Sequence, residues 1–256
     1  MTITITALGG PTSLIELGGL RLVTDPAFDE PRDYILGGGR KVTKTGPTAL
    51  TPDEVVPVDA VLLSHEQHPD NLDESGRAFL SRVPLVLTNA SSAERVDGAT
   101  ALGLWEEYEI ARPDGGGTLT VTRVPALHGP EGAEAVAGEV AGFVLTGEGL
   151  PTVYVSGDNA SLDVVREVKE RFPVIDVALL FAGAARTILL DGALLTLDSA
   201  GAAEATRILD ARHAVPLHFE GWAHFTEGGD LLAKAFAEAD LTDRLTLLTP
   251  GGSATL

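Results

Sequence analysis

Residues 58–73 read VDAVLLSHEQHPDNLD, and they join an apolar segment to a cluster of polar side chains. The first half has the apolar character of a buried strand. The second half holds two histidines, His65 and His68, followed by Asp70 and Asn71. Imidazole and carboxylate groups are common ligands of divalent metals. The stretch therefore predicts either a metal site at the end of a strand or a polar loop in which Asp70 caps the next helix.

An apolar strand followed by a polar motif occurs at three further places. HGP at 128–130, GDN at 157–159 and HFEGWAHF at 218–225 each follow such a run. Loops at strand ends, held by a rigid sheet, are where α/β proteins build sites. If the strand ends converge, one place gathers four imidazoles and two carboxylates, from His65, His68, His128, His218, Asp70 and Asp158. This N/O donor set suits Zn²⁺ first, with Mn²⁺ or Fe as further candidates.

Each of these residues also has an ordinary structural explanation. A lone histidine after a strand is most often a hydrogen-bonded loop residue, and Asp158 is a fair cap for the helix that follows it. HEQHP does not match the zinc-helix motif H-E-x-x-H, because Pro69 stands where the second histidine is needed. The metal prediction therefore rests on the combination of four strand ends in one chain.

The composition limits the classes of partner. The chain carries 37 acidic and 18 basic residues, a formal net charge of −19, and no run of Lys or Arg. This disfavours nucleic acids and anionic membranes, which attract positive charge. No apolar stretch reaches the roughly 18 residues of a membrane helix. We expect a small-molecule substrate, with no nucleic acid or membrane partner, and a homo-oligomer stays open.

The chain contains no cysteine, which removes disulfides, thiolate zinc sites and cysteine nucleophiles. The first residues, MTITITALGG, alternate Thr and Ile without a basic region, which is typical of a strand and not of a signal peptide. These two features favour a cytoplasmic protein.

The predicted elements are strand-rich first and then alternate between strands and helices. We expect a β-meander over the first 25 residues, a long loop over 26–58 and a last strand at RLTLLTP, 244–250. The periodicity predicts helices over 72–82, 160–172, 198–212 and 229–239. Such an order fits a doubly wound sheet or a two-sheet sandwich with outer helices.

Five segments, taken in order, resemble the metallo-β-lactamase-fold hydrolase superfamily: SLIELGGLRLVTDPAF, DAVLLSHEQHPDNLD, VPALHGP, VYVSGDN and VPLHFEGWAHF. The chain is most similar to the stand-alone cytosolic branch that includes L-ascorbate-6-phosphate lactonase. The resemblance implies an α/β (α+β) protein with a four-layer αββα sandwich. It also implies a single domain over 1–256, with metals at one edge between two sheets.

The resemblance implies a ligand set for two metals. His65, His68 and His128 would hold the first metal, Asp70 and His218 the second, and Asp158 would bridge both. In the family a hydroxide between the metals attacks a carbonyl or phosphoryl centre. The chain is therefore expected to be a metal-dependent hydrolase of a small-molecule ester, lactone, amide or phosphodiester, using a metal-bound hydroxide and one or two Zn²⁺ ions.

Three residues near this centre are candidates for further roles. Asp70 would orient the water and take its proton. His224 lies six residues after His218 and could act as a proton donor or an orienting group. Trp222 could line the substrate pocket, although core packing is equally plausible.

Two positions depart from the family pattern. The family places its first two histidines two residues apart, whereas Gln67 makes the spacing three here. A single helical turn would still present both on one face; alternatively, one histidine drops out and Gln67 points into the site. Asn71 stands where the family usually has a histidine, so the second metal site would be weaker.

Asp25 in TDP could support a ligand histidine through a hydrogen bond or could cap a turn before Pro26. The departures also keep a second function open. In that alternative the chain is a metal-poor, catalytically silent member that binds a metabolite or a protein partner.

Overall fold

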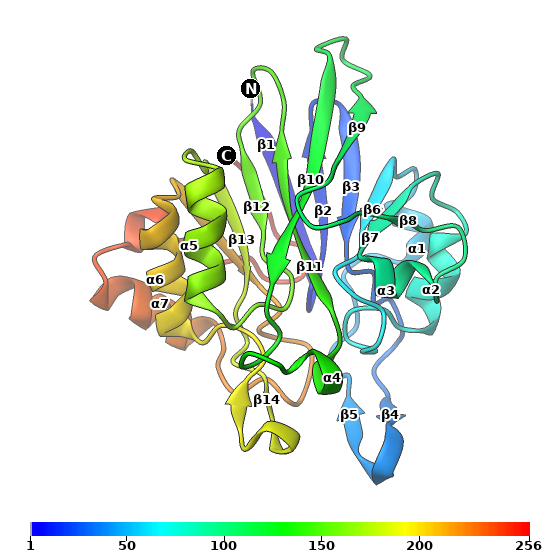
Figure 1. The fold of residues 1–256 in the computed structure, drawn as a ribbon, viewed down its shortest axis with the longest axis vertical. Helices are drawn as coiled ribbons and strands as arrows, with labels where there is room; N and C mark the ends of the chain where they lie inside the picture. The colour runs from blue at the N-terminus through cyan, green and yellow to red at the C-terminus, as the bar shows by residue number, and fades with distance from the viewer. Residues whose placement is uncertain (1) are drawn as a thin grey trace.

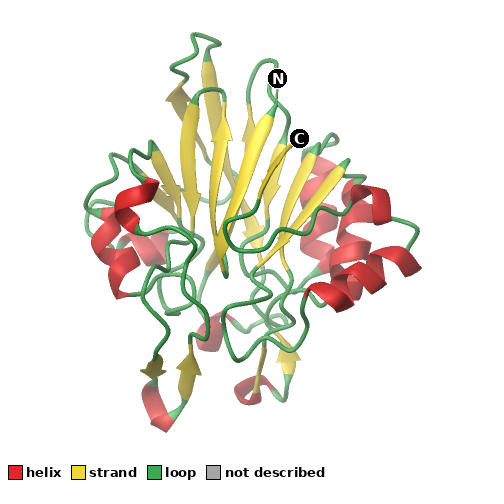
Figure 2. Cartoon of the chain, turned by 180° about the vertical axis from the view of Figure 1, so that it is seen from behind, coloured by secondary structure: helices red, strands yellow, loops and turns green. Residues whose placement is uncertain are grey.

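Two β-sheets pack face to face, and helices cover the outer side of each sheet (Figure 1, Figure 2). The structure is a computed structural model that describes residues 2–256. The layers follow the order helix, sheet, sheet, helix, with both sheets running along the long axis of the molecule. The predicted αββα sandwich is therefore confirmed.

The first sheet has seven strands in the order β17-β1-β2-β3-β6-β7-β8. Its N-terminal strands pair antiparallel as the predicted meander, whereas the strands from β3 to β8 run parallel. Its strands are β1 (Ile3–Gly9), β2 (Thr12–Leu17), β3 (Leu20–Thr24), β6 (Ala60–Leu62), β7 (Val86–Thr88), β8 (Thr100–Ala101) and β17 (Ser253–Thr255).

The second sheet has six strands in the order β16-β13-β12-β11-β10-β9. The pairs from β9 to β12 are antiparallel, and β12, β13 and β16 run parallel. Its strands are β9 (Glu107–Ala111), β10 (Thr118–Ala126), β11 (Val140–Thr146), β12 (Val153–Val155), β13 (Val177–Phe181) and β16 (His213–Leu217).

The core between the sheets follows from the alternation of side chains along the strands. In β1 the isoleucines Ile3 and Ile5 are fully buried, whereas Thr4 and Thr6 are partly exposed. Successive side chains of a strand point to opposite faces, so one face of β1 is apolar. This face packs against Phe143 and Leu179 of the second sheet in one continuous apolar cluster.

The helices bury their apolar faces against the outer sides of the sheets. α5 (Leu162–Arg171), α6 (Ser199–Leu209) and α7 (Gly229–Glu238) cover the second sheet, and α1 (Pro52–Val55), α2 (Glu74–Leu80) and α3 (Ala90–Ala93) lie beside the first. The helices predicted at 72–82, 160–172, 198–212 and 229–239 correspond to α2, α5, α6 and α7. Among residues 2–256, none of the helices combines the length and apolar character that crossing a membrane requires.

The cap of α2 decides between the two roles considered for Asp70. Asp73, not Asp70, is the N-cap residue, and its side chain accepts a hydrogen bond of 2.8 Å from the backbone N–H of Gly76. Asp70 is thereby left free for other contacts. The interpretation of Asp70 as the helix cap is wrong.

The predicted last strand at 244–250 is also wrong. Residues Thr242–Arg244 form a 3-10 turn, and Leu245 makes only an isolated bridge to Ala214. The chain then reverses at Pro250 and the two following glycines, so that β17 pairs with β1 instead. Because of this glycine-rich turn, the strand at the edge of the first sheet is formed by residues 253–255 and not by the apolar residues 244–250.

Two hairpins project from the same end of the sandwich, at the bottom of Figure 1. The first pairs β4 (Asp33–Ile35) with β5 (Lys41–Thr43), inside the segment predicted as a long loop. The second pairs β14 (Arg186–Thr187) with β15 (Ala193–Leu194). The short helix α4 (Glu134–Ala137) lies near them. This end also receives the chain segments that leave β6, β10, β12 and β16.

Candidate metal centre

The loops after β6, β10, β12 and β16 bring six side chains together. The six side chains form two groups. Within each group the potential ligand atoms all lie within 4.8 Å of one another, and Asp158 belongs to both groups. The groups are His65, His68, His128 and Asp158, and Asp70, Asp158 and His218. The geometry thus gathers the six side chains that the sequence predicts as ligands, arranged around a shared aspartate.

In the first group three imidazole nitrogens face one another. The Nδ1 atom of His68 lies 2.9 Å from Nε2 of His65 and 3.3 Å from Nε2 of His128. Oδ2 of Asp158 lies 3.6 Å from Nε2 of His128. The other nitrogen of His128, Nδ1, lies 2.8 Å from the carbonyl oxygen of Leu195. That contact suits Nδ1 as the protonated nitrogen, which leaves Nε2 as a free lone pair toward the group.

Burial keeps two of these imidazoles neutral. Desolvation lowers the pKa of His65 well below its usual range, and the neighbouring His68 adds to the effect. Burial and the nearby His128 likewise lower the pKa of His68. A neutral imidazole has the free lone pair that a metal needs.

A bend over residues 66–68 accommodates the three-residue spacing of the first two histidines. A hydrogen-bonded turn follows it, in which the carbonyl oxygen of His68 accepts from the backbone N–H groups of Asn71 and Leu72, at 3.1 and 3.0 Å. The chain bends between the histidines, and both rings face the same group. The side chain of Gln67 extends toward Ser91, 3.5 Å away, and does not enter the group. Both histidines therefore stay in the group, as the first alternative required, although the segment between them is a bend and not a helical turn.

His218 is the most unusual member of the second group. Its Nε2 atom lies 3.4 Å from Oδ2 of Asp70 and 3.4 Å from Oδ1 of Asp158. Both ring nitrogens are buried, and neither forms a hydrogen bond of ordinary geometry with a described residue. Burial opposes protonation of this ring, but the carboxylate charges of Asp158 and Asp70 outweigh it and raise the pKa of His218 to about 10. Buried polar atoms without hydrogen bonds call for an explanation, and for Nε2 a cation held between the imidazole and the two carboxylates supplies one.

The backbone at His218 is strained as well. Its φ of 57° places a non-glycine residue in the left-handed region directly after β16. Its N–H donates to the carbonyl oxygen of Gly10 at 2.8 Å, which holds this conformation. Strain of this kind is concentrated at functional sites.

The Gly-Asp motif explains how the shared aspartate reaches both groups. Gly157 has φ 57°, and a Cβ built there would lie 2.5 Å from the carbonyl oxygen of Ala141. Only glycine fits this close approach, and the resulting turn presents Asp158 at the end of β12. Burial alone would raise the pKa of Asp158, but the imidazoles of His218 and His128 lower it overall.

Asp25, Ser64 and Asn71 form a buried layer of hydrogen bonds beneath the two groups. Asp25 accepts from the N–H and the hydroxyl of Ser64, at 2.6 and 2.7 Å, and Ser64 Oγ lies 2.9 Å from Nδ1 of His65. Asp25 therefore supports the histidine through Ser64 and not by direct contact. Burial raises the pKa of Asp25 to about 7, against the opposing hydrogen bonds from Ser64.

Asn71 links this layer to the shared aspartate. Its Nδ2 atom donates to Oδ2 of Asp25 at 3.2 Å and to Oδ1 of Asp158 at 3.3 Å. The side chain is fully buried, and no hydrogen bond to its Oδ1 is seen among residues 2–256. Asn71 therefore holds the carboxylate of Asp158 in place through its amide nitrogen.

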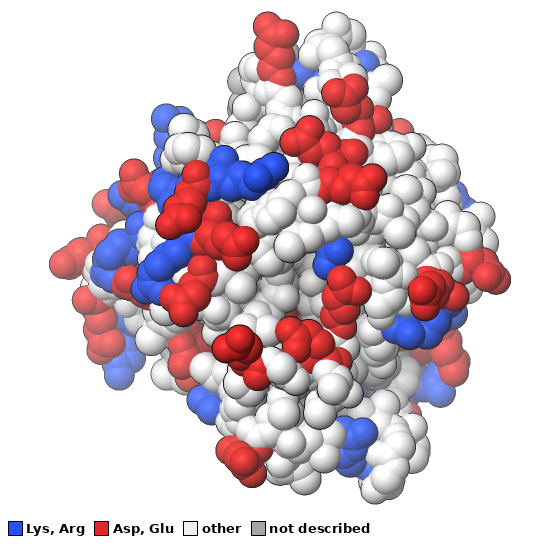
Figure 3. Space-filling view, viewed as in Figure 1, with Lys and Arg blue, Asp and Glu red and all other residues white. Residues whose placement is uncertain are grey.

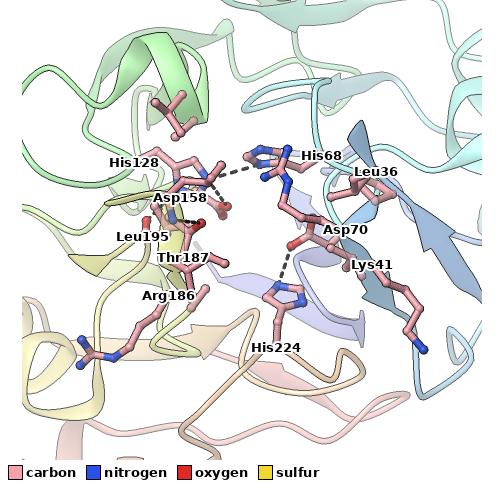
Figure 4. Close-up of a pocket in the computed structure, with 18 residues that line it drawn as sticks. Leu36, Lys41, His68, Asp70, His128, Asp158, Arg186, Thr187, Leu195 and His224 are labelled. Carbon is pink, nitrogen blue, oxygen red and sulfur yellow. Dashed lines mark hydrogen bonds and ion pairs between the residues drawn. The ribbon is translucent and has the colours of Figure 1, made fainter. Parts of the chain in front are cut away.

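His224 and Trp222 occupy different positions. Nε2 of His224 lies 3.1 Å from Oδ2 of Asp70, and its ring is partly exposed to the cavity above the groups (Figure 4). Trp222 does not line this cavity in the described part of the chain. The centroid of its buried ring lies 5.6 Å from the ring centroid of Tyr34 and 5.6 Å from Nζ of Lys44. The structure favours core packing over the predicted pocket wall for Trp222.

A cavity of about 340 Å³ opens over the two groups. His68, Asp70, His128, Asp158 and His224 lie in its wall. Much of the rest comes from the β14–β15 hairpin, whose residues were not predicted to contribute. The segment ARTILLDGALL did contain a signal for it, because an Asp-Gly pair between apolar residues is typical of a hairpin turn.

Comparison with known proteins agrees with this fold. A UPF0173 metal-dependent hydrolase of Pyrococcus furiosus is 26% identical over 209 residues, which cover 80% of this chain and 84% of the relative. Among solved structures, an isothiocyanate hydrolase from gut bacteria of Delia radicum has a TM-score of 0.81 at 21% identity, covering 98% of both chains. A "possible metal-dependent hydrolase" from Veillonella parvula has a TM-score of 0.83 at 15% identity, covering 100% of both chains.

At these identities the solved structures show likeness of fold. The nearer resemblance to L-ascorbate-6-phosphate lactonase stays a prediction. The superfamily itself is shown by a family model, described as a beta-lactamase superfamily domain, that matches residues 20–219. The chain therefore belongs to the beta-lactamase superfamily.

Proposed function

We propose that this protein is a metal-dependent hydrolase of a small-molecule ester, lactone, amide or phosphodiester. The observation that carries the proposal is the pair of ligand groups that share Asp158 in the wall of a cavity. The names of relatives such as the Pyrococcus furiosus protein support the same reaction class. The cavity volume of about 340 Å³ suits a small molecule.

The donor set fits one or two divalent cations. His65, His68 and His128 would hold one ion, Asp70 and His218 would hold a second, and Asp158 would contact both. The position of His218 supports this assignment, because its Nε2 atom lies 3.4 Å from both carboxylates without a hydrogen bond of ordinary geometry, so a cation there could be held by all three groups. The chain has no thiolates, so nitrogen and oxygen donors favour Zn²⁺, with Mn²⁺ or Fe as further candidates.

Cations bound there would supply Lewis acidity and lower the pKa of a water molecule. The chain's own residues then handle the proton. Asp70 lies in the cavity wall, where its carboxylate can orient water and accept a proton. His224, 3.1 Å from that carboxylate and partly exposed, is placed to pass the proton to the leaving group. Both residues are proposed as catalytic.

The proposal is tested with a panel of lactones, esters, amides and phosphodiesters, assayed with added Zn²⁺ or Mn²⁺. We expect turnover of at least one class, loss of that turnover after treatment with a chelator, and recovery when metal is returned. Activity that survives removal of all bound metal would contradict the metal requirement. A metal-loaded protein that hydrolyses nothing across the panel would contradict the hydrolase proposal and favour a silent, ligand-binding member.

A further inference from the structure

The walls of the cavity beyond the ligand groups are mainly apolar. They are contributed by the β4–β5 hairpin, by α4 and by the β14–β15 hairpin, through Leu36, Val42, Val136, Ile188, Leu189 and Leu195. Three of these side chains remain largely exposed: Val136 by 47%, Ile188 by 85% and Leu189 by 49%. Apolar side chains left exposed around a cavity mark a surface that contacts a ligand.

The cavity wall carries more basic than acidic side chains, unlike the chain as a whole. The chain has a net charge of −19, yet among residues 2–256 the only carboxylates that line the cavity are those of Asp70 and Asp158 in the ligand groups. The other charged lining residues are Arg40, Lys41 and Arg186. Figure 4 places Lys41 and Arg186 on opposite sides of the opening, and Figure 3 shows both acidic and basic patches, on otherwise uncharged surface, at the end with the two projecting hairpins.

Two of these cations are not neutralised. Lys41 pairs with Asp33 at 3.1 Å, but Arg40 donates to the carbonyl oxygen of Gly37 and Arg186 to that of Gly192. Within residues 2–256, neither arginine forms an ion pair with a carboxylate, although acidic residues outnumber basic ones about two to one. Both guanidinium groups therefore keep charge and donors for an external anion.

We infer that the cavity takes an amphiphilic organic anion, that is, a soluble molecule with an apolar alkyl or aryl part and a carboxylate, phosphate or sulfonate group. The apolar part packs against the exposed walls of the hairpins and α4, and the charges of Arg40 and Arg186, which belong to the two different hairpins, attract the anionic group to the opening between them. The inference rests on the proposed function in one respect, since the bond to be hydrolysed would lie over the ligand groups.

The test is a fluorescence titration with two matched dyes. The first, 8-anilinonaphthalene-1-sulfonate, is an apolar anion, and the second, N-phenyl-1-naphthylamine, lacks the sulfonate. We expect the zinc-loaded protein to bind the anionic dye more tightly. Arg40→Gln and Arg186→Gln should each lower the affinity for the anionic dye by about three- to fivefold and leave the affinity for the neutral dye unchanged. Arg166→Gln, which breaks an exposed ion pair to Asp163 on α5, is the matched control and should change neither.

A second variant locates the dye. Ile188→Ser removes an exposed apolar side chain from the cavity wall and should lower the affinity for both dyes without unfolding the protein. Equal binding of the two dyes, or anionic binding unaffected by both arginine variants, would overturn the inference. Binding of the protein to phosphatidylglycerol vesicles, with no binding of the free anionic dye, would also overturn it and assign the hairpins to a lipid surface. Because the titration needs no turnover, it can succeed even if the hydrolase proposal fails.

Discussion

The Nε2 atom of His224 lies 3.1 Å from Oδ2 of Asp70, although 154 residues separate them in the chain. Asp70 follows β6 in the first sheet, and His224 follows β16 in the second. The contact therefore spans the two halves of the sandwich at the opening of the cavity. It joins a carboxylate of the ligand groups to a partly exposed imidazole, and we propose that a proton passes through this contact.

Asp70→Asn should lower kcat by about 100-fold or more, because an amide cannot accept the proton that the carboxylate takes. His224→Gln should also lower kcat while bound metal is unchanged, since His224 lies outside both ligand groups. Rates on a substrate found in the panel, together with thermal unfolding curves, check both variants. An Asp70→Asn protein that turns over as fast as the wild type would show that Asp70 is not the base.

Asn71 should affect metal binding through Asp158. Asn71→Leu removes the amide that donates to Asp158 and Asp25, and we expect metal affinity to fall by about 10- to 100-fold. Competition with a chromophoric chelator measures the change. Asn71→His, which adds a ring nitrogen beside Asp158, should instead raise the metal-to-protein ratio toward two. If neither variant alters metal binding, Asn71 serves only to pack the interior.

Asp73 should matter for stability and not for chemistry. Its buried carboxylate pairs with the buried Lys44 at 3.3 Å and accepts backbone N–H bonds from Phe28, Asp29 and Gly76. Asp73→Ala should lower the free energy of unfolding by about 3–5 kcal/mol, because it leaves the lysine charge buried and unpaired. Glu74→Ala, at the exposed neighbouring position, should cost less than about 1 kcal/mol. Denaturant unfolding compares the two, and equal losses would contradict this account.

Residue patterns predicted the strands and the polar strand ends but also allowed a doubly wound sheet, and the superfamily resemblance supplied the αββα layers. Apolar strands and polar strand ends are local patterns, and the sheet brings the strand ends to one edge. The superfamily resemblance supplied the division into two groups around Asp158. That His65 and His68 both face the site was one of two alternatives, and the bend at 66–68 that allows it is also local.

Other features depended on contacts between distant segments. The apolar run at 244–250 predicts a strand by itself, but the partner of β1 is chosen by the turn that follows it. Trp222 fits a pocket wall or a core equally well until Tyr34 and Lys44 are seen beside it. The role of Asn71 required the positions of Asp25 and Asp158, which belong to other strand ends.

The most direct test of the metal centre is the metal content of the purified protein after loading with zinc and removal of unbound ions. Elemental analysis should find between about one and two metal ions per protein chain. His128→Ala should remove at least about half of that metal, because it deletes one of the three histidine donors of the first group. His213→Ala, at a half-buried position outside both groups, should keep the wild-type ratio. A wild-type protein that retains no zinc, manganese or iron, or a His128→Ala protein with unchanged metal, would contradict the account.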